Sequence, residues 1–500
     1  MQTIQTYIGQ LNECPSLIFL FVTYMILVLF SLFFNAQTET KTSNYLKKYK
    51  TPSIVLNLSI LILILMFFLL FSEINVDTLL FNQALTYNYF TNFFQICIVL
   101  FSILCMITSY NYINNNQLNI IEYHLLLLGS VFGALLITIS SDFLILYLSI
   151  ELSSLTLYAL SALKKNSINS TEASLKFLLL GSISSGIYLF GTSLLYGFTG
   201  LINFYDIMIL LSVNHQLYYG IIFGMLFLFI SILFKLGVIP FHMWVPDIYE
   251  GIPLTITIFL SIVPKLAYVS LLLRLSYTVF FPLLKYWQPL FSICGLLSIV
   301  IGSYILISQK KIKRFLAYSG IVHMGYILLG LSTGFLEGIE AVIFYMVIYM
   351  INTLNFWVIF LSLTNLETKK NLIYLTDLNN LYLKNPLLSF LFGLSIFSMA
   401  GIPPLAGFFS KFFIFSALYQ SKMFIPLILS SLISILSVFY YLRIIKIMFF
   451  EEKQNNIQFE QVTFLNSMII VQSSFFLLFF FFYIDTFLIF IKYVGLFLVK

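Results

Sequence analysis

Residues 234–265, FKLGVIPFHMWVPDIYEGIPLTITIFLSIVPK, place ionisable groups and helix-breaking residues between two long apolar runs. The stretch contains Lys235, His242 and Lys265, and it is interrupted by Pro240, Pro246, Pro253 and Pro264. Charged groups and broken helices are both costly in hydrocarbon, and they occur there where protein or a water-filled cavity satisfies them. We therefore predict that this stretch is the functional centre of a membrane protein.

The composition excludes an ordinary soluble protein. Of the 500 residues, 60% are hydrophobic and 9% are charged, whereas charged residues make up about a quarter of soluble domains. Phe and Tyr are abundant, while arginine occurs only at Arg274, Arg314 and Arg443. This bias toward residues with A/T-rich codons indicates an organellar genome. The chain has no GxGxxG or P-loop pattern and no long loop, so we expect neither a nucleotide site nor an extramembrane domain.

Apolar runs of about 18 residues or more predict an all-α polytopic membrane protein with about 14 transmembrane helices. Their approximate limits are 16–34, 53–72, 89–109, 121–140, 142–163, 173–197, 218–239, 253–279, 287–308, 314–332, 339–363, 387–420, 425–449 and 465–497. The twelfth run is long enough to contain a break. We expect four parts: helices 1–3 (1–120), repeat 1 with helices 4–8 (121–285), repeat 2 with helices 9–13 (286–450), and helix 14 (451–500).

Basic residues indicate the orientation. Clusters follow spans 1, 5, 9 and 11: Lys41, Lys47, Lys48 and Lys50; Lys164 and Lys165; Lys310, Lys311, Lys313 and Arg314; and Lys369, Lys370 and Lys384. With fourteen spans, all of these clusters fall on one side. The positive-inside rule places that side in the cytoplasm or matrix and both termini on the opposite side.

Spans 7 and 12 share an interruption next to a lysine. Span 7 contains Gly237 and Pro240 beside Lys235, and span 12 contains Gly401, Pro403 and Pro404 before Lys411. Paired interruptions of this kind predict two inverted five-helix repeats, with an ion path at broken helices 7 and 12. Two unrelated proline kinks are the alternative.

Few titratable residues lie inside the spans, and six of them form a predicted proton relay: Glu151, Lys176, Lys235, Lys265, His323 and Lys411. A buried Glu151 needs a cation or a proton. We predict that it forms a pair with Lys235 that opens and closes; Lys176 is the other candidate partner, and a static ion pair is the alternative. Burial favours the neutral amine, so Lys265 can exchange a proton near neutral pH.

The remaining polar residues have more than one interpretation. His323 is either a bridge between Lys265 and Lys411 or a hydrogen-bonded structural histidine. His242 and Asp247 flank the first break and serve either its geometry or the relay. Residues nearer the helix ends are expected at the interface or against lipid: Arg274, Arg443, Lys446 and His124. We expect Trp244, Trp287 and Trp357 to be interface anchors or packing groups.

Four cysteines are scattered without a CxxC pair: Cys14, Cys97, Cys105 and Cys294. Cys97 and Cys105 lie eight residues apart on an apolar run, and we expect these two to pack in the core rather than to form a metal or redox site. We expect no disulfide, zinc site or iron–sulfur cluster in this chain.

Four segments resemble one known family. Residues 234–265, Ser174–Gly197 (SLKFLLLGSISSGIYLFGTSLLYG), Arg314–Gly330 (RFLAYSGIVHMGYILLG) and Ala400–Phe413 (AGIPPLAGFFSKFF) are similar to the antiporter-like membrane subunits of respiratory complex I, the proton-pumping NADH:ubiquinone oxidoreductase. The wider family includes Mrp-type cation/proton antiporters. The resemblance covers most of residues 120–420, and lysine at position 411 resembles the subunit 2 branch.

The resemblance implies a subunit that conducts protons across the mitochondrial inner membrane while other subunits oxidise NADH and reduce ubiquinone. It implies that this chain binds no cofactor, whereas the complex uses NADH, FMN, iron–sulfur clusters and ubiquinone elsewhere. It also implies that Glu151, Lys235, Lys265 and Lys411 carry the relay beside neighbouring membrane subunits and lipid.

Two alternatives differ in class. A free-standing or Mrp-like Na+/H+ antiporter would exchange sodium for protons by itself. A subunit of an enzyme would need its partners, because its apolar outer faces would be unstable alone. A purely structural membrane protein would not explain so many central ionisable groups.

Overall fold

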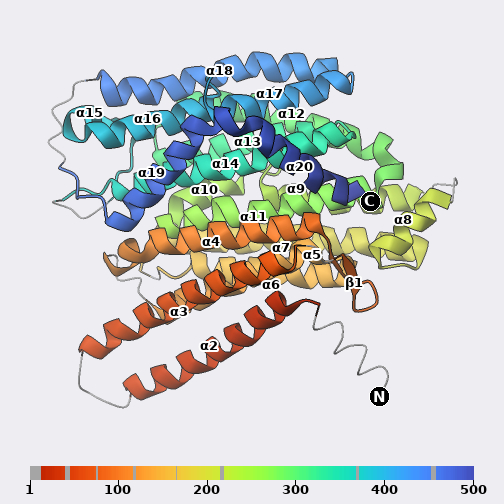
Figure 1. The fold of residues 1–500 in the computed structure, drawn as a ribbon, viewed down its shortest axis with the longest axis horizontal. Coiled ribbons are helices and arrows are strands. Elements are labelled where there is room, and N and C mark those ends of the chain that lie inside the picture. Colours follow the sequence, from red (N-terminus) through yellow and green to blue (C-terminus); the bar gives the residue numbers. More distant parts are fainter. Residues whose placement is uncertain are drawn as a thin grey trace. The chain divides into compact units, whose positions relative to one another are not determined.

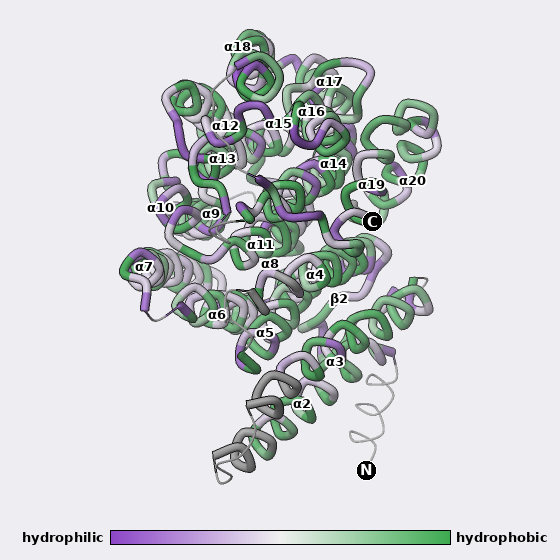
Figure 2. The backbone as a smooth tube through the Cα atoms, turned by 90° about the vertical axis from the view of Figure 1, so that its left-hand side faces the viewer, coloured by the Kyte–Doolittle hydropathy of each residue, from purple (hydrophilic) through white to green (hydrophobic). Residues whose placement is uncertain are grey.

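The computed structural model describes residues 13–39, 45–74, 77–115, 120–164, 166–213, 219–366, 371–451 and 458–499. Thirteen helices in these residues are long and apolar enough to cross a membrane. The prediction of an all-α polytopic membrane protein is confirmed. The predicted twelfth span is present as two helices of 15 residues each, α16 and α17, so the count of fourteen spans stays a prediction. Figure 1 shows a chain that is helical almost throughout, and Figure 2 shows hydrophobic residues along most of its helices.

The chain divides into two compact units, Met1–Ile232 with Gly251–Pro282, and Leu233–Glu250 with Leu283–Lys500. Of the predicted basic clusters, Lys41, Lys165, Lys369 and Lys370 lie outside the described residues, as do the side chains of Lys47, Lys48 and Lys50. The predicted four-part division and the inversion of its repeats stay predictions.

The first unit is built around α11. Its elements are α2 (Pro15–Glu39), α3 (Tyr45–Ser72), β1 (Thr78–Leu80), β2 (Leu85–Tyr87), α4 (Tyr89–Asn115), α5 (Ile121–Ile139), α6 (Phe143–Ser161), α7 (Ile168–Thr199), α8 (Phe204–Val213), α9 (Tyr219–Leu236) as far as Ile232, α11 (Leu254–Arg274) and the π-helical η1 (Leu275–Val279). α11 packs against α4, α5 and α6. In the span that contains α11, 94% of the apolar window is buried, whereas in the span of α2 only 28% is buried. α11 is therefore central and α2 peripheral.

Two elements of the first unit were not predicted. An antiparallel hairpin pairs Thr78 with Tyr87 and Leu80 with Leu85, and its turn takes Phe81, Asn82 and Gln83 through positive φ. The short helix α8 lies between the predicted spans 173–197 and 218–239, where no helix was predicted. Neither segment is long enough to span a membrane, so hydropathy alone could not reveal them.

The prediction that Arg274 and His124 contact lipid or the interface is wrong, because both side chains are buried. The Arg274 guanidinium donates to the carbonyls of Thr138 and Ser140, at 2.6 and 2.9 Å, and to the Thr86 hydroxyl at 2.7 Å. The last carbonyls of a helix have no intrahelical partner and carry its negative dipole end. Arg274 therefore caps α5 instead of reaching lipid. Arg443 is exposed and donates to the Ile307 carbonyl.

The second unit is built around α14. It contains the end of α9 and then α10 (Trp244–Gly251) as far as Glu250, α12 (Leu284–Ser308), α13 (Ile312–Leu331), α14 (Leu336–Ser362), η3 (Leu375–Leu378), α15 (Leu381–Lys384), α16 (Pro386–Ala400), α17 (Ala406–Gln420), α18 (Phe424–Phe449), α19 (Phe464–Phe479), η4 (Phe480–Tyr483) and α20 (Ile484–Val499); the 3-10 turn η2 (Phe281–Leu283) lies at the boundary. α14 packs against α13, α16, α17, α19 and α20. Trp287 and Trp357 are fully buried in this unit, so they are packing groups.

The two predicted helix breaks are confirmed. α9 ends at Leu236, the chain turns at Gly237 with φ +72°, and helix resumes at Trp244. α16 ends at Ala400, Gly401 has φ +86°, and helix resumes at Ala406. A positive φ is strained for residues with a Cβ, and proline cannot donate to a helical carbonyl, so both breaks follow from glycine and proline chemistry.

Candidate proton-relay site

Lys265 lies halfway along α11, and its side chain is buried. Pro264, directly before it, is accommodated inside the continuous helix. Three residues further along α11, the Tyr268 hydroxyl interacts with Ser153 and with the charge of Glu151, both on α6. The first unit therefore brings the helix of Lys265 against the helix of Glu151.

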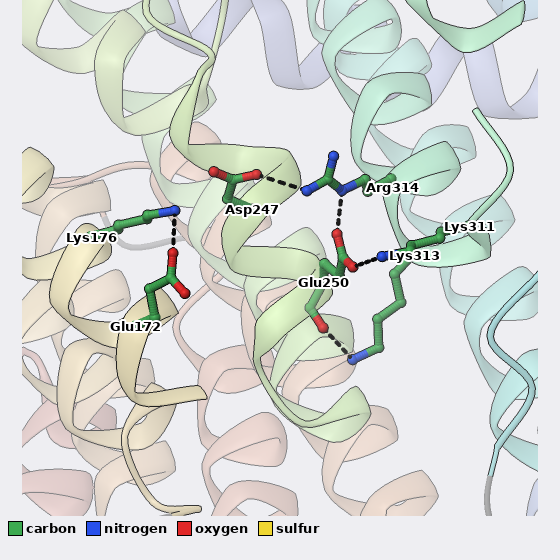
Figure 3. A network of polar contacts seen from close by, with 7 residues as sticks. All are labelled: Glu172, Lys176, Asp247, Glu250, Lys311, Lys313 and Arg314. Carbon is green, nitrogen blue, oxygen red and sulfur yellow. Dashed lines mark hydrogen bonds and ion pairs between the residues drawn. The ribbon is translucent and has the colours of Figure 1, made fainter. Parts of the chain in front are cut away.

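Glu151 and Lys176 lie on the neighbouring helices α6 and α7. Oε1 of Glu151 is buried and has no hydrogen-bond partner among the described residues. The Lys176 ammonium forms an ion pair with Glu172, one turn earlier on α7, at 2.7 Å (Figure 3). Sequence reasoning missed Glu172, although its i, i+4 spacing from Lys176 is the usual one for such a pair. Because Lys235 belongs to the second unit, its pairing with Glu151 stays a prediction.

Lys411 is held at the second helix break. Its Nζ donates to the Ala400 carbonyl at 2.7 Å and to Ser437 Oγ at 3.2 Å, and it lies 5.6 Å from the centre of the Tyr326 ring. Ala400 is the last residue of α16, where carbonyls lack helical partners and the helix dipole is negative. The break thus supplies an acceptor for the buried ammonium, which explains why a Gly/Pro interruption and a lysine occur together here.

His323 on α13 has a hydroxyl partner at each ring nitrogen. Nδ1 lies 2.7 Å from the Tyr345 hydroxyl, and Nε2 lies 3.2 Å from the Tyr441 hydroxyl. A tyrosine hydroxyl can donate or accept, so this arrangement suits either tautomer of the imidazole. Both interpretations of His323, structural and relay, fit these contacts. Sequence reasoning missed both tyrosines, because neither stands in a recognisable motif among the 32 in this chain.

His323 and Lys411 line the same small cavity, together with Tyr345, Tyr349, Asn352, Ser398 and Ser410. Its volume is about 10 Å³, close to the smallest space that holds one water molecule. The buried Oδ1 of Asn352 has no hydrogen-bond partner among the described residues. The second unit therefore brings together two of the predicted relay residues around one polar space.

The first break lies beside Lys235, at the end of α9. The Trp244 indole donates to the Phe234 carbonyl at 3.0 Å, which ties the start of α10 to the residue before Lys235. The His242 ring contacts the Tyr318 ring of α13, with centroids 6.4 Å apart. His242 Nδ1 is buried without a hydrogen-bond partner among the described residues.

Asp247 lies in an ion-pair network that the sequence analysis did not anticipate. Arg314 at the start of α13 donates from Nη2 to Asp247 at 3.2 Å and from Nε to Glu250, and Lys311 also donates to Glu250 (Figure 3). Partial burial opposes the Glu250 charge, but Lys311 and Arg314 hold the pKa of this carboxyl below its usual value of 4.5. From the sequence, Lys311 and Arg314 indicated only which side of the membrane the loop faces.

The family model described as "NADH:quinone oxidoreductase/Mrp antiporter, TM" matches residues 140–437. The chain belongs to this family. All six predicted relay residues lie within the matched region. NADH-quinone oxidoreductase subunit N of Pelagibacter ubique is 37% identical over 413 residues, which are 82% of this chain and 86% of that protein. NADH-ubiquinone oxidoreductase chain 2 of Marchantia polymorpha is 38% identical over 445 residues, 87% of this chain and 88% of that one.

Solved structures agree with this membership. A chain of respiratory complex I from Thermus thermophilus superposes with a TM-score of 0.78 at 25% identity, over 95% of this chain and 98% of that one. A chain of the Mrp complex from Dietzia sp. superposes with a TM-score of 0.83 at 16% identity, over 98% of both chains. At 16% identity, the similarity to the Mrp complex chain shows a shared fold only. It is not evidence that this chain is an antiporter.

Proposed function

We propose that this chain is an antiporter-like membrane subunit of a proton-pumping NADH:quinone oxidoreductase and that it translocates protons. The observation that carries the proposal is the site around Lys411: a buried ammonium bound to the carbonyl at a helix break, sharing a polar cavity with a histidine bonded to two tyrosine hydroxyls. The 38% identity to a chain 2 protein favours the respiratory enzyme over a free-standing antiporter.

Protons move along this site through groups that both accept and donate. Lys411 holds a proton against the Ala400 carbonyl, and the loss of that proton leaves an amine that can accept one from the cavity. His323 exchanges protons at either nitrogen through the tyrosine hydroxyls. Charges interact strongly away from water, so charging one lysine favours the neutral form of its neighbours. This coupling drives the proton along Glu151, Lys176, Lys235, Lys265, His323 and Lys411.

The relatives also support a location for this chain. The Marchantia polymorpha and Oenothera berteroana chain 2 proteins support a multi-pass subunit of the mitochondrial inner membrane. In that setting the chain acts as part of a translocase and assembles with other complex I membrane subunits. The chain binds no cofactor: NADH, FMN, iron–sulfur clusters and ubiquinone act in other subunits.

A native gel of the source membrane in mild detergent tests membership of the enzyme. Probing for this chain and staining for NADH dehydrogenase activity should give one very large active band. A small inactive band would instead favour the Na+/H+ antiporter, and sodium-dependent proton exchange by the chain in liposomes would establish it.

Neutralising Lys265 tests the relay. We expect Lys265→Ala in the assembled enzyme to abolish proton translocation while the complex still forms, because the buried amine at the centre of α11 is lost. Proton uptake by proteoliposomes during NADH oxidation measures the effect. Normal pumping by this variant would remove the central step of the proposal.

A further inference from the structure

The strongest charged cluster outside the relay joins α10 to α13. Glu250 accepts hydrogen bonds from Arg314 Nε and Lys311 Nζ, while Asp247 on the same helix accepts from Arg314 Nη2 at 3.2 Å. Lys313 Nζ also reaches the Glu250 backbone carbonyl at 3.4 Å. Both acids of α10 therefore face the basic start of α13 (Figure 3). Charge-assisted hydrogen bonds of this kind are stronger than neutral ones.

α10 depends on such contacts for its position. It has eight residues, and helices shorter than about 12 residues are marginal in water without tertiary packing. Its N-terminal side begins at the helix break, where α9 ends at Leu236 and Gly237 has a positive φ. The segment from Gly237 to Glu250 is therefore positioned by what α10 contacts.

α10 is connected to the residue next to Lys235 by a single hydrogen bond. Trp244, the first residue of α10, donates its indole N–H to the Phe234 carbonyl at 3.0 Å, directly before Lys235. His242 lies between these points and contacts Tyr318, which stands one turn after Arg314 on α13. α13 also carries His323, so one helix contacts the first break and contributes a residue to the second site.

We propose that Glu250 and Asp247 latch α10 to the start of α13 and so position the break that carries Lys235 and His242 for proton transfer. Glu250 is a positioning residue in this scheme: among the described residues its carboxylate accepts hydrogen bonds from Lys311 and Arg314, and it acts through α10 and Trp244. The inference rests on the proposed proton-translocating function.

A double-mutant cycle in the assembled enzyme tests the latch. The variants are Glu250→Gln, Arg314→Gln and the pair together, and the measurement is protons translocated per NADH oxidised in proteoliposomes. Partly exposed ion pairs contribute modestly, so we expect a loss of about two- to fivefold for each single variant, with the same amount of assembled complex. The double variant should lose less than the product of the two single losses, because both variants remove the same Glu250–Arg314 contact and residues in contact are not additive.

Glu451→Gln is the matched control. Glu451 pairs with Lys446 in the same unit at 3.4 Å on an exposed surface, and its loss should leave the ratio unchanged. A wild-type ratio in Glu250→Gln, or additive losses in the double variant, would overturn the latch. If Glu250→Gln does not assemble, Arg314→Gln decides: a lowered ratio supports the latch, and a wild-type ratio overturns it. Failure of the unmodified complex to pump would instead contradict the proposed function.

Discussion

At the scale of single residues, this chain stabilises buried cationic side chains with backbone carbonyls. Lys411 binds the Ala400 carbonyl and the Ser437 hydroxyl, and Arg274 binds the carbonyls at the end of α5. A carbonyl at a helix end attracts a cation but does not neutralise it as a carboxylate would. A lysine held in this way can lose its proton without leaving a buried anion unpaired.

Replacing Lys411 by methionine tests this role. We expect Lys411→Met to abolish proton translocation and to destabilise the protein by about 1–3 kcal/mol, because the buried Ala400 carbonyl loses its donor. Proton uptake in proteoliposomes and thermal unfolding of the complex measure the two effects. Ser437→Ala, which keeps the lysine and its carbonyl partner, should retain pumping. Equal loss in both variants would mean that the serine, and not the ammonium charge, is decisive.

At the scale of elements, each break combines a glycine at positive φ with a nearby lysine. A Cβ added at Gly401 would lie 3.0 Å from Lys411 Cδ. The same residue therefore provides the turn and the space for the lysine side chain. The first residue of the GIPP motif (Gly401–Pro404) must therefore be a residue without a Cβ.

Gly401→Ala should damage the second break. The left-handed backbone conformation costs a residue with a Cβ about 1–2 kcal/mol, and the crowded Lys411 side chain must also shift. We expect a lower melting temperature of the complex together with reduced pumping. Gly393→Ala in α16 is the matched control, since its Cβ would meet only Phe449 at 3.8 Å and alanine favours helix. A neutral Gly401→Ala would show that neither the turn nor the space is required.

A second element-scale feature is the attachment of α2. Glu73 follows α3, is buried, and accepts hydrogen bonds from the backbone N–H and the hydroxyl of Ser16, at 2.8 and 2.7 Å. It therefore caps the first turn of a helix that is distant in sequence. Burial raises the pKa of Glu73 above its usual value of 4.5, although the Ser16 hydrogen bonds oppose the shift.

The docking of α2 should consequently depend on pH. A carboxyl whose pKa is raised by folding contributes stability that is complete below its usual pKa and is lost as the pH rises through the raised value. We expect hydrogen exchange in the first turn of α2, corrected for the intrinsic rate, to accelerate as the pH rises above 4.5. Glu73→Gln should remove this dependence, because the amide keeps an oxygen acceptor without titrating. An unchanged profile in that variant would assign the effect to another group.

At the scale of the whole molecule, apolar surface is distributed unevenly among the spans. The spans of α11, α13 and α14 are 89–94% buried, whereas those of α18 and of α19 to α20 are each 22% buried. Extended apolar faces of this kind mark contacts with lipid or with other proteins. The peripheral helices thus form the surfaces through which a membrane subunit meets its neighbours.

The chain should therefore be unstable without its partner subunits. We expect expression in a membrane that lacks the other complex I membrane subunits to yield aggregated or degraded protein, and co-expression to restore a discrete species. Size-exclusion chromatography in mild detergent measures the difference. A monodisperse, stable single chain would favour the free-standing antiporter.

Hydropathy, glycine and proline act locally and the motifs occur in a fixed order. The all-α membrane fold, both helix breaks and the family could therefore be predicted from the sequence alone. It also identified Lys265 and Lys411 as buried ammonium groups, since each stands far from any polar loop.

The groups that these residues contact could not be predicted from the sequence and follow from the packing of the helices. The Ala400 carbonyl that binds Lys411, the tyrosines around His323 and the acids of α10 that bind Arg314 come from separate elements, and no local pattern records them. The partners of Arg274 could not be predicted either. Its position near a helix end predicted contact with lipid, but α11 packs against α5, and Arg274 binds carbonyls at the end of α5. Side-chain partners depend on which helix faces meet, and that is a property of the packed chain.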